Sequence, residues 1–450
     1  MRIFKHHFFA LVATAGAMFL GFTPSAHAVP SFARQTGMAC AACHTTFPEL
    51  TEFGRMFKMN GYVLTGIQQI QAGGGQQLKI NAIPPLSAMF VTSISQMSKS
   101  LSDPVSGANM QNGTVEFPQE MSLFFAGEIS DHMGAFTQLT YEPDGDHFSI
   151  DNTDIRYAKH YKVGGEDSIW GLTLNNNPTV EDVFQTTPAW GFPFISSAVT
   201  PEPIAATQID GTLAQQVAGM GAYTFIADHY YIGATLYRSA HTGQDIPYGA
   251  TTEGGNINGV APYWRLAYHY DFGNSDSEIG YYGMKVDLAP NGNGGTPDTF
   301  TDNAIDAYFE HFMGTDSITF RATYIHEKAN LDASQPLGLA SNGSDTLNTL
   351  NANVKYNFLG NMGAALGYIS TTGDTDALRY PADTNTGSAS GSPDTKYWIA
   401  QYSYLPWENV QLGLQYSWYS KFNGASNNYD GNGRNASDNN TLYGYGWFVW

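Results

Sequence analysis

Most of the chain beyond residue 77 alternates between apolar and polar side chains with a period of two. In QLGLQYSWYS (411–420), every second residue from Leu412 to Trp418 is apolar, and small or polar residues stand between them. The segment WRLAYHY, from Trp264 to Tyr270, repeats this pattern. The alternation predicts strands with one apolar and one polar face. A soluble antiparallel sandwich would also alternate, so periodicity alone does not decide the fold class.

The lengths of the connections are more decisive. Strands are predicted at 84–98, 117–129, 132–142, 148–161, 167–176, 214–226, 229–239, 262–271, 276–287, 300–311, 315–327, 345–358, 361–371, 395–404, 409–421 and 441–450. The connections alternate, with short ones near 130, 228, 272, 314, 360 and 407, and long ones that include 99–116, 177–213, 240–261, 328–344, 372–394 and 422–440. An even number of strands joined in this way is the plan of a bacterial outer-membrane barrel. We therefore predict a mainly β fold, a 16-stranded antiparallel, porin-like transmembrane β-barrel over residues 76–450.

Composition supports a membrane barrel over a water-soluble domain. Aromatic residues make up 14% of the chain and charged residues only 13%, whereas about 25% of the residues in soluble domains are charged. A lipid-facing wall needs little charge. The aromatic residues are expected mainly as strand and girdle residues of such a wall. The last strand is also aromatic and ends at Trp450, which suits the barrel assembly machinery.

Residues 1–28 have the features of a secretory signal peptide. They carry Arg2 and Lys5, an apolar run, and small residues before a cleavage site expected after Ala28. No later apolar stretch approaches the roughly 20 residues of a membrane-spanning helix. Cleavage would leave 18 Lys and Arg against 40 Asp and Glu, a net charge of −22. Such a charge disfavours nucleic acid as a partner and favours cations.

The only two cysteines lie together in TGMACAACHTTFPEL (36–50), where Cys40 and Cys43 are followed directly by His44. In an oxidising compartment the two thiols could form a disulfide, and a redox dithiol is another alternative. The spacing C-x-x-C-H favours a different interpretation, because it is the attachment signature of c-type haem. Both thiols would add to the haem vinyl groups, and His44 would bind the iron.

Residues 29–75 are predicted to form a small haem domain on the periplasmic side. Chains this short seldom fold without a cofactor, metal or partner. An amphipathic helix is expected over 48–62, with Leu50, Phe53, Met56 and Phe57 on one face. We expect this domain to dock against or inside the barrel. The glycines Gly73–Gly75 would then form a bend into the first strand, with a flexible linker as the alternative.

The segment PSFARQTGMACAACHTTFPELTEFGRMFKMNGY (30–62), the barrel pattern and NNNPTVEDVFQTTPAWGFPF (175–194) together carry a resemblance. The chain resembles the fused monohaem cytochrome c and porin family of the outer membrane, whose best-known members oxidise ferrous iron. The resemblance implies one covalently attached haem c on Cys40, Cys43 and His44. It also implies an extracellular electron donor, Fe(II) or another, and a periplasmic c-type cytochrome as acceptor. The alternative function is a porin or channel in which the haem domain is a structural plug or sensor.

The sixth ligand of the haem iron is less well determined by the sequence. No histidine lies between His44 and His132, so we expect a methionine from the same small domain. Met59 is favoured, with Met56, Met38, a residue of the barrel or water as alternatives. Methionine ligation would raise the haem potential relative to two histidines, although a methionine on a helix is more often core filling.

Two further groups of residues are candidates for ligand contacts. Arg34 and Arg55 would match the haem propionates, or else are solvated charges. In the outer loops, Asp144, Asp146, Asp151, Asp430 and Asp438 offer oxygen ligands for hard cations such as Fe(II) or calcium. Asp and Asn are also the ordinary residues of exposed turns, and that interpretation is favoured for the loop acids.

Overall fold

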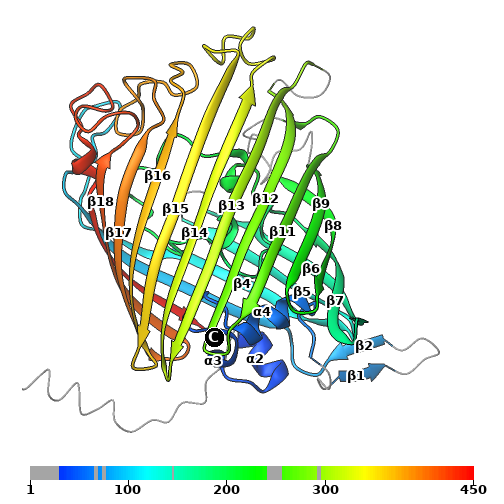
Figure 1. The fold of residues 1–450 in the computed structure, drawn as a ribbon. Coiled ribbons are helices and arrows are strands. Elements are labelled where there is room, and N and C mark those ends of the chain that lie inside the picture. The colour runs from blue at the N-terminus through cyan, green and yellow to red at the C-terminus, as the bar shows by residue number, and fades with distance from the viewer. Residues whose placement is uncertain (1–29, 65–68, 73–77, 144–145, 241–255, 291–294) are drawn as a thin grey trace, which may run out of the picture.

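Sixteen antiparallel strands close into a barrel in the computed structural model (Figure 1). The structure describes residues 30–64, 69–72, 78–143, 146–240, 256–290 and 295–450. The strands are β3 (Leu86–Met97), β4 (Thr114–Ser130), β5 (Met133–Glu142), β6 (His147–Val163), β7 (Glu166–Asn175), β8 (Val217–Ile226), β9 (Tyr230–Ser239), β11 (Ala261–Asp271), β12 (Ser275–Ala289), β13 (Asp298–Met313), β14 (Asp316–Asn330), β15 (Ser344–Phe358), β16 (Met362–Gly373), β17 (Thr395–Trp407), β18 (Val410–Lys421) and β19 (Thr441–Val449). The barrel closes where β19 pairs with β3, from Thr441 opposite Met97 to Val449 opposite Met89. The predicted fold class is confirmed.

The connections follow the predicted alternation with one exception. Short turns such as 131–132 and 314–315 lie at one end of the barrel, and long loops such as 374–394 and 422–440 lie at the other. The exception is the connection from β5 to β6, which spans only residues 143–146. A short strand, β10 (Asn256–Ile257), adds to β12 at the long-loop end. The signal peptide, Gly73–Gly75 and Asp144 lie outside the described residues.

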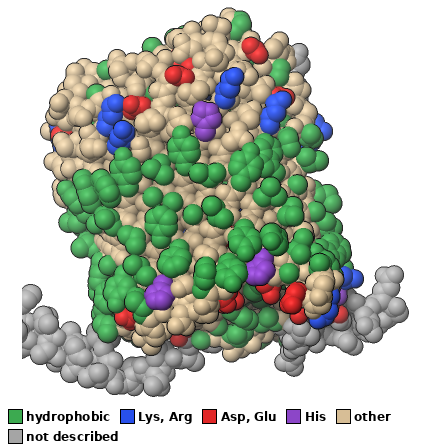
Figure 2. Space-filling model, viewed as in Figure 1, with side chains coloured by type: hydrophobic (Ala, Val, Ile, Leu, Met, Phe, Trp, Pro, Cys, Tyr) green, Lys and Arg blue, Asp and Glu red, His purple; other side chains and the backbone are tan. Residues whose placement is uncertain are grey.

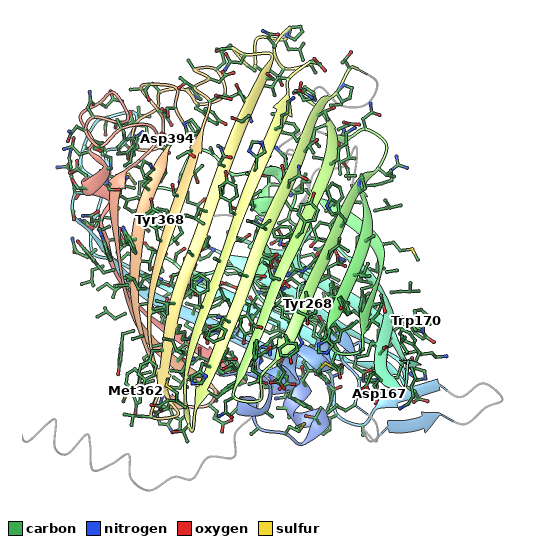
Figure 3. The ribbon with its side chains drawn as sticks, in the orientation of Figure 1. Asp167, Trp170, Tyr268, Met362, Tyr368 and Asp394 are labelled. Atoms are coloured by element: carbon green, nitrogen blue, oxygen red, sulfur yellow. The ribbon has the colours of Figure 1, made fainter. Side chains whose placement is uncertain are left out.

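The outer wall of the barrel is apolar and its inner wall is polar. Along β13, Ile305 and Phe309 are exposed, while Asp302, Asp306 and Glu310 are buried inside. Apolar side chains cover the wall, and charged side chains gather toward the two ends (Figure 2). Trp170 and Tyr268 lie on this wall near the short-turn end (Figure 3). An apolar outer surface with aromatic residues near its edge is typical of outer-membrane barrels. Among the described residues, no helix has the length and apolar character needed to span a membrane.

The connection between β7 and β8, residues 176–216, folds into the barrel and is called the inner loop here. Most of its residues from 177 to 187 are buried. Asp182 accepts hydrogen bonds from the backbone N–H groups of Phe184, Thr186 and Thr187 at 3.0–3.1 Å. Its Oδ1 atom, which accepts the Phe184 N–H, also lies 3.3 Å from a guanidinium nitrogen of Arg265 on β11. The inner loop is therefore fixed to the inner wall by a buried ion pair.

Residues 30–64 occupy the barrel at its short-turn end (Figure 1). They form the helices α2 (Pro30–Thr36), α3 (Cys40–Cys43) and α4 (Glu52–Met59). Glu49 binds Arg321 of β14 at 2.7 Å and also binds Lys355 of β15. On the far side of the lumen, the Tyr62 hydroxyl donates to Asp154 of β6 at 2.7 Å. The predicted docking of this N-terminal segment against the barrel is confirmed.

Two details of the N-terminal region differ from the sequence prediction. The helix expected over 48–62 is limited to Glu52–Met59, because the Thr51 hydroxyl accepts the Gly54 N–H at 3.1 Å and caps its first turn. In the sequence, a hairpin of β1 (Gln69–Ala72) and β2 (Leu78–Asn81) lies between the N-terminal segment and the first barrel strand, β3. The boundary expected at 75/76 falls between these two strands.

The barrel plan predicts which connections can be reached from outside the cell. We expect an epitope tag inserted after Asp383, in the long connection 374–394, to be labelled by antibody on intact cells. A tag inserted after Gly314, in the turn 314–315, should be labelled only after the outer membrane is permeabilised. The reverse pattern would show that the barrel has the opposite orientation.

The docking of the N-terminal segment should depend on pH through Glu49. Burial alone would raise the pKa of Glu49, but Lys355 and Arg321 outweigh it and hold the pKa at about 2. Because this pKa lies below the ordinary value of 4.5, the pairing stabilises the docked segment fully above about pH 4.5 and is lost as the pH falls toward 2. Pepsin digestion across this range should release peptides from 30–64 progressively.

The matched variants are Glu49→Gln and Glu166→Gln. The first leaves Arg321 and Lys355 buried without their carboxylate, a change that typically costs about 3–5 kcal/mol, so the segment should be released across the whole pH range. The second changes an exposed residue at the same end of the barrel and should behave as wild type. Identical digestion of all three proteins would contradict the role of the ion pair.

Candidate haem site

The C-x-x-C-H sequence forms a single helical turn. The His44 backbone N–H donates to the Cys40 carbonyl at 2.9 Å, and His44 then leaves the helix with an extended backbone. Cys40 is buried and Cys43 is half-buried, and in the described chain both are thiols rather than a disulfide. Burial raises the pKa of the Cys43 thiol to about 11. The turn thus presents two thiols and an imidazole within five consecutive residues.

Helix α4 packs directly on this turn. The Thr51 N–H donates to the Cys43 carbonyl at 2.9 Å, and the Thr51 hydroxyl donates to the Ala42 carbonyl at 2.6 Å. A Cβ atom at Gly54 would lie 2.3 Å from the Cys43 carbonyl oxygen. Glycine at this position therefore allows the close approach of the two helices that positions the cysteine turn.

Beside the turn lies a cavity of about 410 Å³, within the range of roughly 300–1,000 Å³ that is common for cofactor sites. Its lining is mostly apolar and comes from the N-terminal segment, from β3, β4, β5, β6 and β19, and from the inner loop. The lining includes Cys43, His44, Phe47, Lys58, Met89, Trp190 and Trp447. The Phe47 ring lies 5.9 Å from the His44 ring and 6.3 Å from the Trp447 ring.

His44 carries the clearest sign of a missing ligand. In the described part of the chain, its Nδ1 atom is buried and has no hydrogen-bond partner, which is costly for a ring nitrogen. Burial lowers the pKa of His44 and keeps the imidazole neutral, the form that binds metals. A neutral imidazole with an unpartnered Nδ1 atom, two thiols and a mostly apolar cavity fit the chemistry of a c-type haem.

Lys58 and Met89 also line this cavity, and neither is expected as a site residue from the sequence. The Lys58 ammonium donates to the carbonyls of Val180 and Asp182 at 2.6 and 2.8 Å and lies 4.7 Å above the Trp190 ring. Burial lowers the pKa of Lys58 to about 7, so an anionic group beside it would favour its charged form. Met89 points into the lumen from β3 and packs in one cluster with Cys40, Phe47 and Trp447.

The ligand candidates named from the sequence lie elsewhere. Met59 is buried against Ile169 and Phe184, in a cluster that Met56 also contacts. Arg55 is paired with Asp276 and donates to the Tyr308 hydroxyl at 3.1 Å.

Arg34 donates to the Leu86 carbonyl, and Met38 is half-buried beside Thr36. None of Arg34, Met38, Arg55, Met56 and Met59 is among the residues that line the cavity. Their assignments to the iron and to the propionates stay predictions, and the cavity offers Met89 and Lys58 for the same roles.

The described acidic loop residues act in local hydrogen bonding. Asp146 accepts from the Tyr141 hydroxyl, and Asp430 accepts from backbone N–H groups of its own loop. Asp438 accepts the Asn435 N–H at 3.0 Å, and Asp151 accepts the Gln215 amide at 2.9 Å. Within the described ranges, no three or more His, Cys, Asp or Glu side chains are placed to hold a metal ion. The contacts of Asp146, Asp430 and Asp438 agree with the turn interpretation. Asp151 differs from the expectation, because it lies within strand β6 and lines the cavity.

No family model matches the chain, and no curated protein matches it. Similar solved structures are outer-membrane proteins. The OmpF of Salmonella typhi in complex with daunomycin is 12% identical, with a TM-score of 0.48, and covers 85% of this chain and 100% of its own. The anion-selective porin of Comamonas acidovorans is 12% identical, with a TM-score of 0.44, and covers 81% and 98%. At these identities and TM-scores, the similarity carries no information about the cavity.

Proposed function

We propose that this outer-membrane barrel is an electron-transfer protein that carries one haem c in the cavity beside His44. The observation that carries the proposal is the buried, unpartnered Nδ1 atom of His44, next to two thiols and an apolar cavity inside a barrel. When bound, the haem supplies a centre that accepts and donates single electrons. The donor is expected outside the cell, Fe(II) or another reductant, and the acceptor is a periplasmic c-type cytochrome.

The residues of the chain would hold the haem in distinct ways. Cys40 and Cys43 would attach it covalently, and His44 would bind the iron. Met89, the methionine among the lining residues, would take the sixth position, and Lys58 would face a propionate. The apolar side chains of Phe47 and Trp447 would cover part of a bound haem, which would disfavour the more charged ferric state and raise the potential.

The position of the cavity suits a periplasmic acceptor. The helices α2, α3 and α4 lie at the short-turn end of the barrel (Figure 1), and in bacterial barrels this end faces the periplasm. A carrier that docks on this end would approach the cysteine turn closely. Electrons from the donor would enter from the long-loop end.

A porin-type channel is the second candidate, and the barrel itself favours it. Its strand number and its alternation of short turns and long loops are those of porins. The inner loop and the N-terminal segment would then restrict the pore, and the haem domain would be a plug or sensor. Conductance in planar bilayers that opens fully on deletion of 29–75, together with a haem that does not react with reductants, would support this candidate.

The cysteine variants test the electron-transfer proposal. Cys40→Ser and Cys43→Ser should insert as barrels yet lack full thioether attachment, because the attachment chemistry lies outside the strands. Oxidised wild type mixed with Fe(II) in a stopped-flow experiment should show rapid haem reduction. A double cysteine variant that keeps covalent haem on a denaturing gel would contradict the haem assignment, and an unreactive wild-type haem would contradict the function.

The role of Met89 as an iron ligand can be tested with Met59 as its matched control, since both methionines are buried. Met59 belongs to the N-terminal segment, and Met89 packs against that segment. We expect Met89→Leu to abolish the long-wavelength absorbance band of ferric haem that marks methionine–iron bonding, and to lower the haem potential. Met59→Leu should leave both unchanged. If Met59→Leu has these effects and Met89→Leu does not, the ligand is the one expected from the sequence.

A further inference from the structure

A second cavity of about 240 Å³ lies on the other side of the inner loop from the haem cavity. Both cavities are lined by Pro188, Gly191 and Pro193 of the inner loop. The turn Pro188–Pro193 therefore separates the two spaces as a single layer of chain. The second cavity is bounded on its other side by inward-facing residues of β14, β15, β16 and β17.

The wall of the second cavity is one continuous patch of neighbouring strands. Asn351 pairs with Thr323 on one side and with Ile369 on the other, and Thr349 pairs with Ile325. Thr323 and Asn351 lie at the middle of their strands, and Ile325, Thr349 and Ile369 lie in the halves that lead to the long loops. The cavity is therefore nearer the outer face of the barrel than the haem cavity is.

Three oxygen groups in this cavity lack partners in the described part of the chain. Thr349 Oγ1 and Asn351 Oδ1 are buried and have no hydrogen-bond partner. The Asn351 amide nitrogen donates to the Phe192 carbonyl, so its oxygen is the atom left over. No described side chain or backbone group pairs with the Asp210 carboxylate, and burial raises the pKa of Asp210 to about 6.

Asp210 is held in place by the wall, because the two residues before it are hydrogen-bonded to neighbouring strands. The Ile209 N–H donates to Asp302 at 2.7 Å, and the Gln208 N–H donates to Glu327 at 2.6 Å. No Lys, Arg or His is among the residues that line this cavity. The surroundings are thus negative and rich in acceptors, which excludes anions and suits a cation.

We propose that this cavity binds a hydrated divalent cation of the hard class, such as Mn(II) or Fe(II), through Asp210, Thr349 and Asn351. Carboxylate, hydroxyl and amide oxygens are the ligands that such cations take, and the remaining positions would be filled by water. With a single carboxylate ligand, the site would have a low affinity for the cation, as expected for a substrate that enters and leaves.

Resting on the proposed function, the site is where the electron donor is held. Fe(II) held by Asp210 would give up one electron and leave as Fe(III), and a haem held by Cys40, Cys43 and His44 would accept that electron. No bond forms or breaks. Among the described residues, the turn Pro188–Pro193 lies between the two spaces, so the electron would cross this turn without an open pore.

The cation site is tested with Mn(II) and the purified full-length protein carrying its haem. Titration followed by the electron paramagnetic resonance signal of free Mn(II) should show one saturable site per chain. Asp210→Asn should weaken binding at least about tenfold and Thr349→Val a few-fold, because each removes one ligand. Asp167→Asn, an exposed carboxylate at the short-turn end, should bind as wild type.

The outcomes separate the site from the proposed function. Absence of saturable Mn(II) binding by wild type, as expected for a cavity that holds water only, would overturn the site. So would wild-type affinity in both Asp210→Asn and Thr349→Val.

For the donor role, Asp210→Asn should slow haem reduction by Fe(II) while reduction by ascorbate, an anion, is unchanged. Equal Fe(II) rates in wild type and Asp210→Asn would overturn that role. A wild-type haem that Fe(II) does not reduce would overturn the role, and one that neither Fe(II) nor ascorbate reduces would overturn the proposed function as well, while the Mn(II) titration decides the site separately.

Discussion

The interior of this barrel depends on buried charges being paired between its wall and the segments inside it. Glu49 meets Arg321 and Lys355, and Asp182 meets Arg265. Removing such charges from water costs several kcal/mol each, and only well-placed opposite charges and hydrogen bonds compensate for that cost. These contacts therefore specify where the N-terminal segment and the inner loop lie more than they add net stability. The ladder of strand hydrogen bonds holds the wall.

The cavity beside His44 follows from this pairing. The cysteine turn has few contacts of its own, and its place is set by α4 through Thr51 and Gly54 and by the loop around Glu49. The inner loop contributes the other side, because Lys58 is bonded to the carbonyls of Val180 and Asp182. Two segments far apart in sequence are thus required to enclose one apolar space, and neither could form it alone.

Much of the fold could be predicted from the sequence, because a period of two is a local property of each strand. The bounds of β7, Glu166–Asn175, differ by one residue from the predicted 167–176, and the strand count is confirmed. The site was less predictable. A methionine of the same small domain, Met59 first, is expected as the ligand because no histidine lies between His44 and His132. The pairing of Arg55 with Asp276 instead turns α4 so that Met59 packs against the wall.

Met89 and Lys58 could not have been identified from the sequence in the same way. Alternation shows that Ser87, Met89 and Val91 share one face of β3, but which strands meet the cysteine turn depends on the closure of β19 onto β3. The role of Lys58 depends on a contact with residues more than 120 positions away. Such contacts leave no local signal in a single sequence.

A filled barrel is compatible with transport across the outer membrane only for a species that needs no open path. An electron is such a species, because its transfer requires closeness of donor and acceptor and not continuity of solvent. The turn Pro188–Pro193 keeps the polar and the apolar cavity apart while both touch it. Under the proposed function, the separation of the two cavities has a chemical consequence. It keeps a hydrated cation and its oxidised product on the long-loop side, and it leaves the dry space around His44 to the haem.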